Sequence, residues 1–172
     1  FRCVAPEVDE APLTGETPAA LAARLALAKA RAGLQRTPGA LCIGSDQTAC
    51  GPDGELFGKP GTVERAIAQL ERLSGTSATF HTALALVDGR HADAPAQQRT
   101  VVTTVRFRSL TRTEIERYVA REPALDCAGA AKIEGLGISL LEELAGPDPT
   151  ALIGLPLIAL GDMLRKAGLA LP

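Results

Sequence analysis

The sequence is poor in aromatic residues, which make up 3% of its 172 residues, and it has no tryptophan and a single tyrosine. Because 46% of the residues are nevertheless hydrophobic, the core must be built from Leu, Ile, Val and Ala. A chain of this length suits one domain with a sizeable core. Membrane-spanning apolar runs and a recognisable signal peptide are also lacking, so we expect no membrane partner.

Neither sign of charge dominates, since 18 Lys and Arg face 20 Asp and Glu and the net charge is −2. Such a chain has no overall attraction to a nucleic-acid polymer, and an anionic ligand would need a local cluster of basic side chains. The four cysteines lack the paired spacing of zinc sites, which predicts free thiols in a reducing cytoplasm. The two histidines are far apart in sequence, and we expect them to be structural or surface groups.

Helical and strand patterns alternate along the chain without strict βαβ regularity. Four stretches have helical spacing and end signals: 17–33, 63–75, 111–122 and 156–168. Five stretches are predicted strands: 1–5, 40–43, 77–87, 101–108 and 138–144. Residues 92–98 are predicted to form a polar loop. This pattern predicts an α/β fold, a mixed sheet with flanking helices.

The stretch around Asp46 is the strongest candidate for a functional site. A short apolar run at 40–43 predicts a strand buried on both faces, and Asp46 follows where that run ends. The chain then turns at 51–54 and returns to Lys59, so a hairpin would bring an acid and a base together. This arrangement suits the activation of water against a phosphate. A surface Asp and Lys beside a turn would give the same pattern.

Two further features are compatible with a ligand or with a purely structural role. Lys29 lies at the edge of the apolar stripe of the first helix, where its ammonium group could reach water or point into a cleft. Three glycines between 129 and 137 would let the backbone approach a ligand closely. That passage is neither a P-loop nor a dinucleotide fingerprint, and a connecting loop would explain it equally well.

The order of motifs along the whole chain closely resembles the Maf family. The matching motifs are APEVDE (5–10), RLALAKA (24–30), GSDQ (44–47), GKP (58–60), LSG (73–75), AG (128–129), EGLG (134–137) and IGLPL (153–157). The resemblance implies a single domain over 1–172, with two lobes around a cleft, similar to the inosine triphosphate pyrophosphatase fold. Members of the family are hydrolases that cleave nucleoside triphosphates between the α- and β-phosphates, and they are linked to septum formation.

The resemblance also implies roles for individual residues. Asp46 would accept the proton of the attacking water and touch a divalent metal, Mg²⁺ or Mn²⁺. Lys29 and Lys59 would hold the phosphates. Glu10 would be a second metal ligand, although a solvated acid in an acidic loop is an equally good interpretation.

Two residues bear on the choice of nucleotide. Family members that act on dTTP and UTP typically have Thr after the motif Asp and Gln in the later Gly-rich motif, whereas this chain has Gln47 and Glu134. It therefore resembles the branch associated with 7-methyl-GTP. A carboxylate at 134 can accept hydrogen bonds from the donor edge of guanine and offset the positive charge of the N7-methylated ring. The alternative is a dTTP/UTP or broad-range pyrophosphatase.

The sequence begins at Phe1 without a methionine. In the family, a strand and a Ser-x-x-Arg-Arg loop that grips the triphosphate would lie just upstream, so we expect that this segment is missing from the sequence. Arginines bind phosphate in a bidentate manner that lysine cannot reproduce. A nucleotide-binding regulator of cell division without catalytic activity is therefore an alternative. The sequence also leaves a homodimer open.

Overall fold

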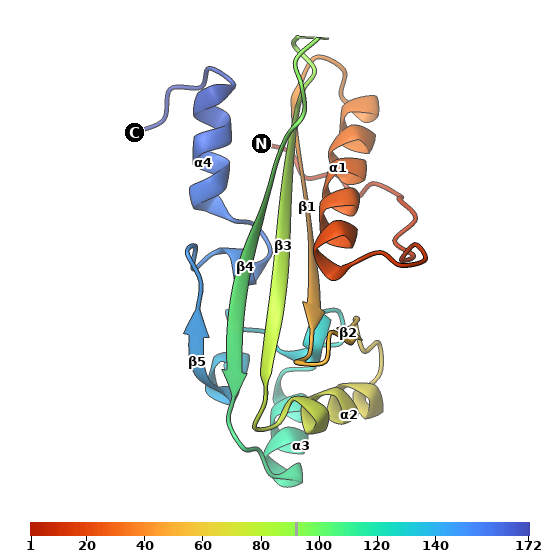
Figure 1. Ribbon diagram of the computed structural model, residues 1–172, viewed down its shortest axis with the longest axis vertical. Helices are drawn as coiled ribbons and strands as arrows, with labels where there is room; N and C mark the ends of the chain where they lie inside the picture. The colour runs from red at the N-terminus through yellow and green to blue at the C-terminus, as the bar shows by residue number, and fades with distance from the viewer. Residues whose placement is uncertain (92) are drawn as a thin grey trace.

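The computed structural model describes residues 1–91 and 93–172. Within these residues, four α-helices surround one five-stranded sheet (Figure 1). The elements follow in the order α1 (Pro18–Arg36), β1 (Leu41–Cys50), β2 (Leu56–Phe57), α2 (Val63–Leu73), β3 (Ser77–Asp88), β4 (Gln97–Phe107), α3 (Arg112–Arg121), η1 (Ala128–Ala130), η2 (Leu136–Leu140), β5 (Leu141–Ala145), η3 (Ala151–Ile153) and α4 (Leu157–Lys166). The three η elements are short 3₁₀ helices.

The strand order is β2-β1-β3-β4-β5, and each neighbouring pair is antiparallel. The α/β class with flanking helices is thus confirmed. All pairs of neighbouring strands in the described sheet are antiparallel, whereas the prediction was a mixed sheet. β1 pairs with β3 over its whole length, and with β2 only at Ala49 and Cys50. The turn predicted at 51–54 is the connection that brings β2 back against β1.

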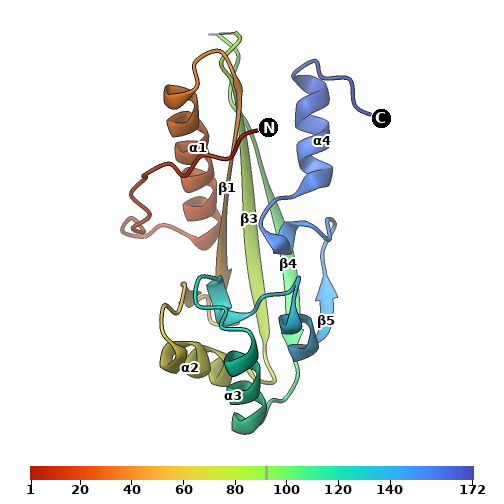
Figure 2. The ribbon, with the colours of Figure 1, turned by 180° about the vertical axis from the view of Figure 1, so that it is seen from behind.

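Helices α1 and α4 lie on opposite faces of the long strands, whereas α2 and α3 gather at the far end of the molecule (Figures 1 and 2). Successive strand residues point to opposite faces. Ala83 and Ala85 of β3 accordingly pack against α1, and Leu84 and Leu86 pack on the α4 side. A larger core joins α2 and α3 to the other ends of β3 and β4. The molecule therefore has two lobes that share the sheet.

Small residues allow α1 to pack closely on the sheet. A Cβ atom at Gly44 of β1 would lie 2.2 Å from the Ala26 carbonyl oxygen of α1. Ala22, Ala26 and Ala30 of the helix are buried against Ala83 and Ala85 of β3. Alanine and glycine at this contact let α1 lie close to β1. The short distance between the two elements allows side chains of α1 and β1 to contact each other.

Several predicted boundaries were wrong. Residues 1–5 form no strand in the described structure and are all exposed; the Ala5 carbonyl instead accepts a hydrogen bond from Arg36 Nη1 (2.8 Å). Helix α1 continues past Gly33, because Gly33 is buried against Cys42 and tertiary packing outweighs its low helix propensity. β5 begins at Leu141, after η2, rather than at 138.

Strand β1 also differs from its prediction. It runs ten residues instead of four, because hydrogen bonds to β3 continue through the polar residues that follow the apolar run. Ile43 is 42% exposed, so the run is not buried on both faces. In the loop predicted at 92–98, β4 already includes the last two residues, and position 92 lies outside the described residues.

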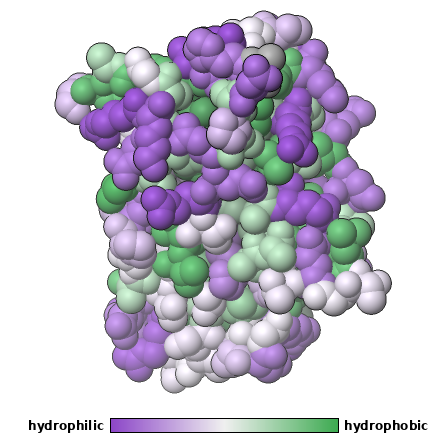
Figure 3. All heavy atoms as spheres, turned by 45° about the horizontal axis from the view of Figure 1, so that its top comes forward, coloured by the Kyte–Doolittle hydropathy of each residue, from purple (hydrophilic) through white to green (hydrophobic). Residues whose placement is uncertain are grey.

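The surface and the cysteines complete the description. On the face shown in Figure 3, hydrophobic groups are scattered among hydrophilic ones. Among the described residues, no helix is long and apolar enough to cross a membrane. The four cysteines are free thiols: Cys42 and Cys50 are buried, Cys127 is partly buried and Cys3 is exposed.

Candidate active site

Asp46 lies in the middle of β1, not at the end of a strand as the sequence predicted, and its side chain points toward α1. Its Oδ1 atom is 2.5 Å from the Lys29 Nζ atom on α1. Both side chains are largely shielded from water, with exposed fractions of 12% for Asp46 and 20% for Lys29. The Lys29 ammonium group therefore points inward, toward Asp46, and not out into water.

Glu10 joins this pair from the loop that precedes α1. Its Oε1 atom is 2.7 Å from Lys29 Nζ, and its Oε2 atom is 3.9 Å from Lys59 Nζ. Lys29 therefore lies between two carboxylates, and Lys59 lies beside the outer one. The structure brings together Glu10, Lys29, Asp46 and Lys59, which come from four separate parts of the sequence.

The acidic loop is held in place by neighbouring polar contacts. Arg24 of α1 donates to the Glu16 carboxylate (2.7 and 2.8 Å) and to the Ala11 carbonyl (2.9 Å). The Asp9 carboxylate accepts a hydrogen bond from the Ala11 amide (3.0 Å). These contacts fix the segment on either side of Glu10 against the start of α1, and so determine where the Glu10 carboxylate lies.

The surroundings of Asp46 and Glu10 change the pKa values of the two carboxyl groups. Burial raises the pKa of Asp46, and the hydrogen bond from Lys29 offsets this only in part. The hydrogen bond from Lys29 lowers the pKa of the more exposed Glu10. Burial acts to lower the pKa of Lys29, but its bonds to both carboxylates outweigh that effect and raise it, so the ammonium group stays charged. The pKa values of the two acids thus shift in opposite directions.

A cavity of about 270 Å³ lies beside β1. Three consecutive β1 residues, Ser45, Asp46 and Gln47, contribute to its wall together with Lys59. The remaining lining residues come from β3 and two loops: Phe80, Asp126, Cys127, Ala128, Ala131, Ile133, Glu134, Leu152, Ile153 and Gly154. Four of the candidate site residues therefore line one cavity: Asp46, Gln47, Lys59 and Glu134.

Gln47 points to the opposite face of the sheet from Asp46. Its Nε2 atom donates to Thr82 Oγ1 (2.7 Å) and to the Ala151 carbonyl of η3 (3.0 Å). Ser45 Oγ lies 2.6 Å from the Gly154 carbonyl, just beyond η3. Ser45 and Gln47 therefore bind the η3 segment to β1 through hydrogen bonds. This segment forms one wall of the cavity.

Some lining residues were missed by the sequence reasoning. Leu152, Ile153 and Gly154 form one wall, and Asp126 and Cys127 contribute to another. The available signal was their position, since Ile153 and Gly154 belong to a family motif and Asp126 and Cys127 immediately precede one. Leucine, isoleucine and glycine are not typical catalytic residues, and Asp126 and Cys127 lie in no sequence pattern that would have selected them.

The acids of the site that could contribute to a divalent-cation site are Glu10 and Asp46. In the described residues, no group of three or more His, Cys, Asp or Glu side chains is arranged to hold a metal. Glu10 and Asp46 nevertheless converge on a single point, the Lys29 ammonium. Mg²⁺ is commonly bound by one or two carboxylates together with substrate phosphates, so a cation at these two carboxylates would need further oxygen ligands from a substrate.

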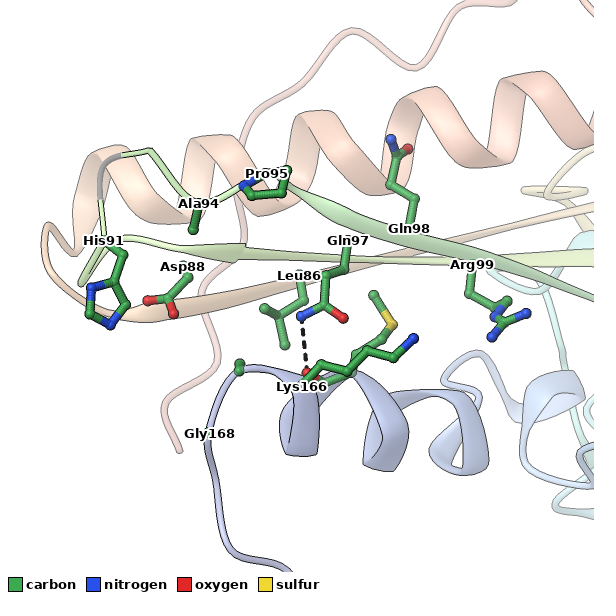
Figure 4. A pocket seen from close by; sticks show the side chains of 12 residues that line it. Leu86, Asp88, His91, Ala94, Pro95, Gln97, Gln98, Arg99, Lys166 and Gly168 are labelled. Carbon is green, nitrogen blue, oxygen red and sulfur yellow. Dashed lines mark hydrogen bonds between the residues drawn. The ribbon is translucent and has the colours of Figure 1, made fainter.

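A larger hollow of about 810 Å³ lies elsewhere, between the β3–β4 hairpin and α4 (Figure 4). Asp88, His91, Arg99 and Lys166 line it, and none of the candidate site residues does. The carboxylate of Asp88 is paired with Arg90 (2.8 Å), and Gln97 Nε2 donates to the Met163 carbonyl (3.0 Å). This hollow is therefore separate from the cavity beside Asp46.

Comparison with known proteins finds matches over nearly the whole chain. The model of the family described as Maf-like protein matches residues 1–167. A protein named 7-methyl-GTP pyrophosphatase from Aromatoleum aromaticum is 55% identical over 172 residues, which are 100% of this chain and 87% of that protein. Two others of that name are from Burkholderia thailandensis (56% over 171 residues; 98% of this chain, 78% of that protein) and Xanthomonas oryzae pv. oryzae (55% over 167 residues; 97% and 85%). The chain belongs to the Maf-like family.

Proposed function

We propose that this protein hydrolyses 7-methyl-GTP to 7-methyl-GMP and pyrophosphate. The observation that carries the proposal is one cavity that joins Asp46 and Lys59 to Gln47 and Glu134. The first pair suits the chemistry at a phosphate and the second suits the recognition of a base. The printed names of relatives that are 54–56% identical support the same substrate.

Asp46 acts as the general base. Its carboxylate removes a proton from a water molecule whose oxygen bonds to the α-phosphorus, and the bond from that phosphorus to the bridging oxygen breaks so that pyrophosphate leaves. The raised pKa of Asp46 makes it a better proton acceptor than an exposed aspartate. Its position within β1 fixes the carboxylate on a rigid strand.

Lys29 and Lys59 neutralise the phosphates. Lys29 is held in one orientation by two carboxylates, so its positive charge is already in place when the transition state forms. Lys59 has an exposed side chain (65%) and is suited to follow the outer phosphates. A divalent cation bound by Glu10 and Asp46 would supply further neutralisation of the triphosphate when present.

The base is recognised on the other side of the cavity. The Glu134 carboxylate accepts hydrogen bonds from the N1–H and N2–H₂ groups of guanine and offsets the charge of the methylated ring. Ile133, Leu152 and Ile153 offer apolar surface to the ring. Gln47 holds the η3 wall through the Ala151 carbonyl, which affects the width of the base pocket.

The direct test is pyrophosphate release from a panel of 7-methyl-GTP, GTP, UTP and dTTP, each with Mg²⁺ or Mn²⁺. We expect 7-methyl-GTP to have the highest kcat/KM. A preference for UTP or dTTP would instead support a pyrimidine or broad-range pyrophosphatase. Binding of nucleotides without release of pyrophosphate would support a regulator without catalytic activity, and omission of the metal tests the proposed cofactor.

The setting of this activity is also a proposal. Four free cysteines, one of them on the cavity, suit a reducing cytoplasm. We infer a cytoplasmic enzyme that acts on free nucleotides, either as a monomer or as a homodimer, which the sedimentation of the purified protein would distinguish. A link to septum formation would require a division phenotype in cells that lack the catalytic carboxylate.

A further inference from the structure

The loop that carries Glu134 is attached to α3 at both ends. At its start, the Lys132 amide donates a hydrogen bond to the Tyr118 hydroxyl oxygen (3.0 Å). At its other end, the Leu136 amide donates to the Glu122 carboxylate. Tyr118 lies in the last turn of α3, and Glu122 is the residue that caps the end of this helix.

The loop is also closed on itself. The amides of Gly135 and Gly137 both donate to the Lys132 carbonyl (3.2 and 2.9 Å). A Cβ atom at Gly137 would lie 2.4 Å from that same carbonyl oxygen, and one at Gly135 would lie 2.1 Å from Glu122 Oε1. The Lys132 backbone therefore requires glycine at 137, whereas a side chain at 135 would displace the Glu122 carboxylate.

Helix α3 provides a rigid anchor for these contacts. Ile115, Tyr118 and Val119 are buried in the core shared with α2, with exposed fractions of 0, 5 and 2%. Burial raises the pKa of Tyr118 to about 12, so its hydroxyl group stays neutral and keeps its place beside the Lys132 amide. The position of the loop is thus set by the core of one lobe, whereas Lys29 and Glu10 belong to α1 and its preceding loop in the other.

We propose that Tyr118 and Glu122 are positioning residues that hold the Glu134 loop in the conformation needed to recognise the base. The inference rests on the proposed function, because it assigns Glu134 to the nucleotide base. Neither side chain lines the cavity. They act through the backbone on either side of Glu134, and they therefore control the choice of nucleotide rather than the cleavage of the phosphate bond.

The test uses the full chain and four variants: Tyr118→Phe, Glu122→Ala, Glu122→Gln and Glu134→Gln. Tyr118→Phe keeps the buried ring and removes only the acceptor for Lys132. Glu122→Gln keeps an acceptor oxygen for Leu136, whereas Glu122→Ala removes it. We expect Tyr118→Phe and Glu122→Ala to raise the KM for 7-methyl-GTP roughly 3- to 10-fold with little change in kcat, and Glu122→Gln to restore most of the loss.

A double-mutant cycle separates positioning from general destabilisation. In the Glu134→Gln background, adding Glu122→Ala should cause little further loss of preference for 7-methyl-GTP over GTP, because the group being positioned is already changed. Full additivity of the two losses would overturn the proposal. So would wild-type KM and selectivity in both Tyr118→Phe and Glu122→Ala.

Hydrogen exchange provides a measurement that does not depend on catalysis. Tyr118→Phe should speed exchange of the Lys132 amide and Glu122→Ala that of the Leu136 amide, and unchanged rates would overturn the attachment itself. If Glu134→Gln lowers selectivity but the α3 variants do not, only this inference fails. If the wild-type chain releases no pyrophosphate from any nucleotide, the proposed function fails, whereas the exchange rates still decide whether α3 holds the loop.

Discussion

The Lys29 ammonium of α1 lies 2.5 Å from the Asp46 carboxylate of β1, and this ion pair joins the first helix to the candidate catalytic strand. The contact depends on the small residues around it, since Gly44 and Ala26 let α1 approach β1 closely. Lys29 thereby places a fixed positive charge beside a shielded acid. The first three predictions concern this pair.

Removal of the Asp46 charge should abolish most of the activity. We predict that Asp46→Asn lowers the turnover of 7-methyl-GTP by on the order of 10²–10⁴, because the variant cannot accept the proton of the attacking water. Circular dichroism should show an intact fold, since asparagine has nearly the same shape. Turnover near the wild-type value would remove Asp46 from the mechanism.

Lys29 and Lys59 form a matched pair for testing the phosphate contacts. Lys29→Met leaves the shielded Asp46 without its cation, so we predict a loss in kcat of at least about tenfold. Lys59 is mostly exposed and lies 3.9 Å from Glu10; we predict that Lys59→Met mainly raises KM. Steady-state kinetics of both variants measure kcat and KM separately. Equal effects of the two substitutions on kcat would contradict the different roles assigned to the two lysines.

The pH dependence of kcat/KM should report the environment of Asp46. Burial raises the pKa of this carboxyl group above its usual value of 3.8. Because the general base must be ionised, activity is complete above this pKa and falls as the pH drops through it. We predict an acid limb at higher pH than an exposed aspartate would give, and Lys29→Met should move the limb further upward. A limb that stays in place in this variant would argue against Asp46 as its source.

Exchange of Gln47 and Glu134 for the residues typical of dTTP and UTP hydrolysis should change the nucleotide preference. We predict that the double variant Gln47→Thr, Glu134→Gln loses preference for 7-methyl-GTP and gains relative activity on UTP. The loss of the carboxylate removes the acceptor for the guanine edge, and threonine no longer reaches the η3 carbonyls as Gln47 does. Kinetics on both nucleotides provide the measurement, and an unchanged ratio would refute this specificity assignment.

Asp148 is expected to stabilise the η3 wall and the start of α4. It is 3% exposed and accepts hydrogen bonds from the Thr150 amide (2.9 Å), the Thr150 hydroxyl (2.6 Å) and the Ile158 amide (2.8 Å). We predict that Asp148→Ala lowers the free energy of unfolding by about 1–3 kcal/mol. Urea denaturation measures the loss. Asp162→Ala, which removes an exposed acid 3.7 Å from Arg165, is the control and should change little.

The same carboxylate gives a pH dependence of stability. Burial acts to raise the pKa of Asp148, but the hydrogen bonds from Thr150 and from the amides of Ile158 and Ala159 outweigh it and lower the pKa. An acid with a lowered pKa in the folded state stabilises the fold above its pKa in the unfolded state, and that contribution is lost as the pH falls through the folded value. The difference in unfolding free energy between wild type and Asp148→Ala should therefore shrink in acid. A constant difference would contradict the role of the ionised form.

The sequence predicted most of the elements from local signals. The capping box at Thr111 and Glu114 and the apolar spacing of α2 gave the positions of two helices, because capping and periodicity are properties of neighbouring residues. Where tertiary contacts opposed the local signal the prediction failed. Helix α1 passes through Gly33, and the polar residues of β1 are held in a strand by β3.

For the site, the sequence by itself determined which residue types are present in which motifs, and therefore the family and the candidate acid, lysines and base-recognising carboxylate. Only the tertiary structure decided that Lys29 lies between Glu10 and Asp46, and that Glu134 is held from α3 by Tyr118 and Glu122. These contacts join residues 14 to 19 positions apart. No local pattern encodes such distances, because they arise from the close packing of α1 on β1 and from the burial of α3 in its core.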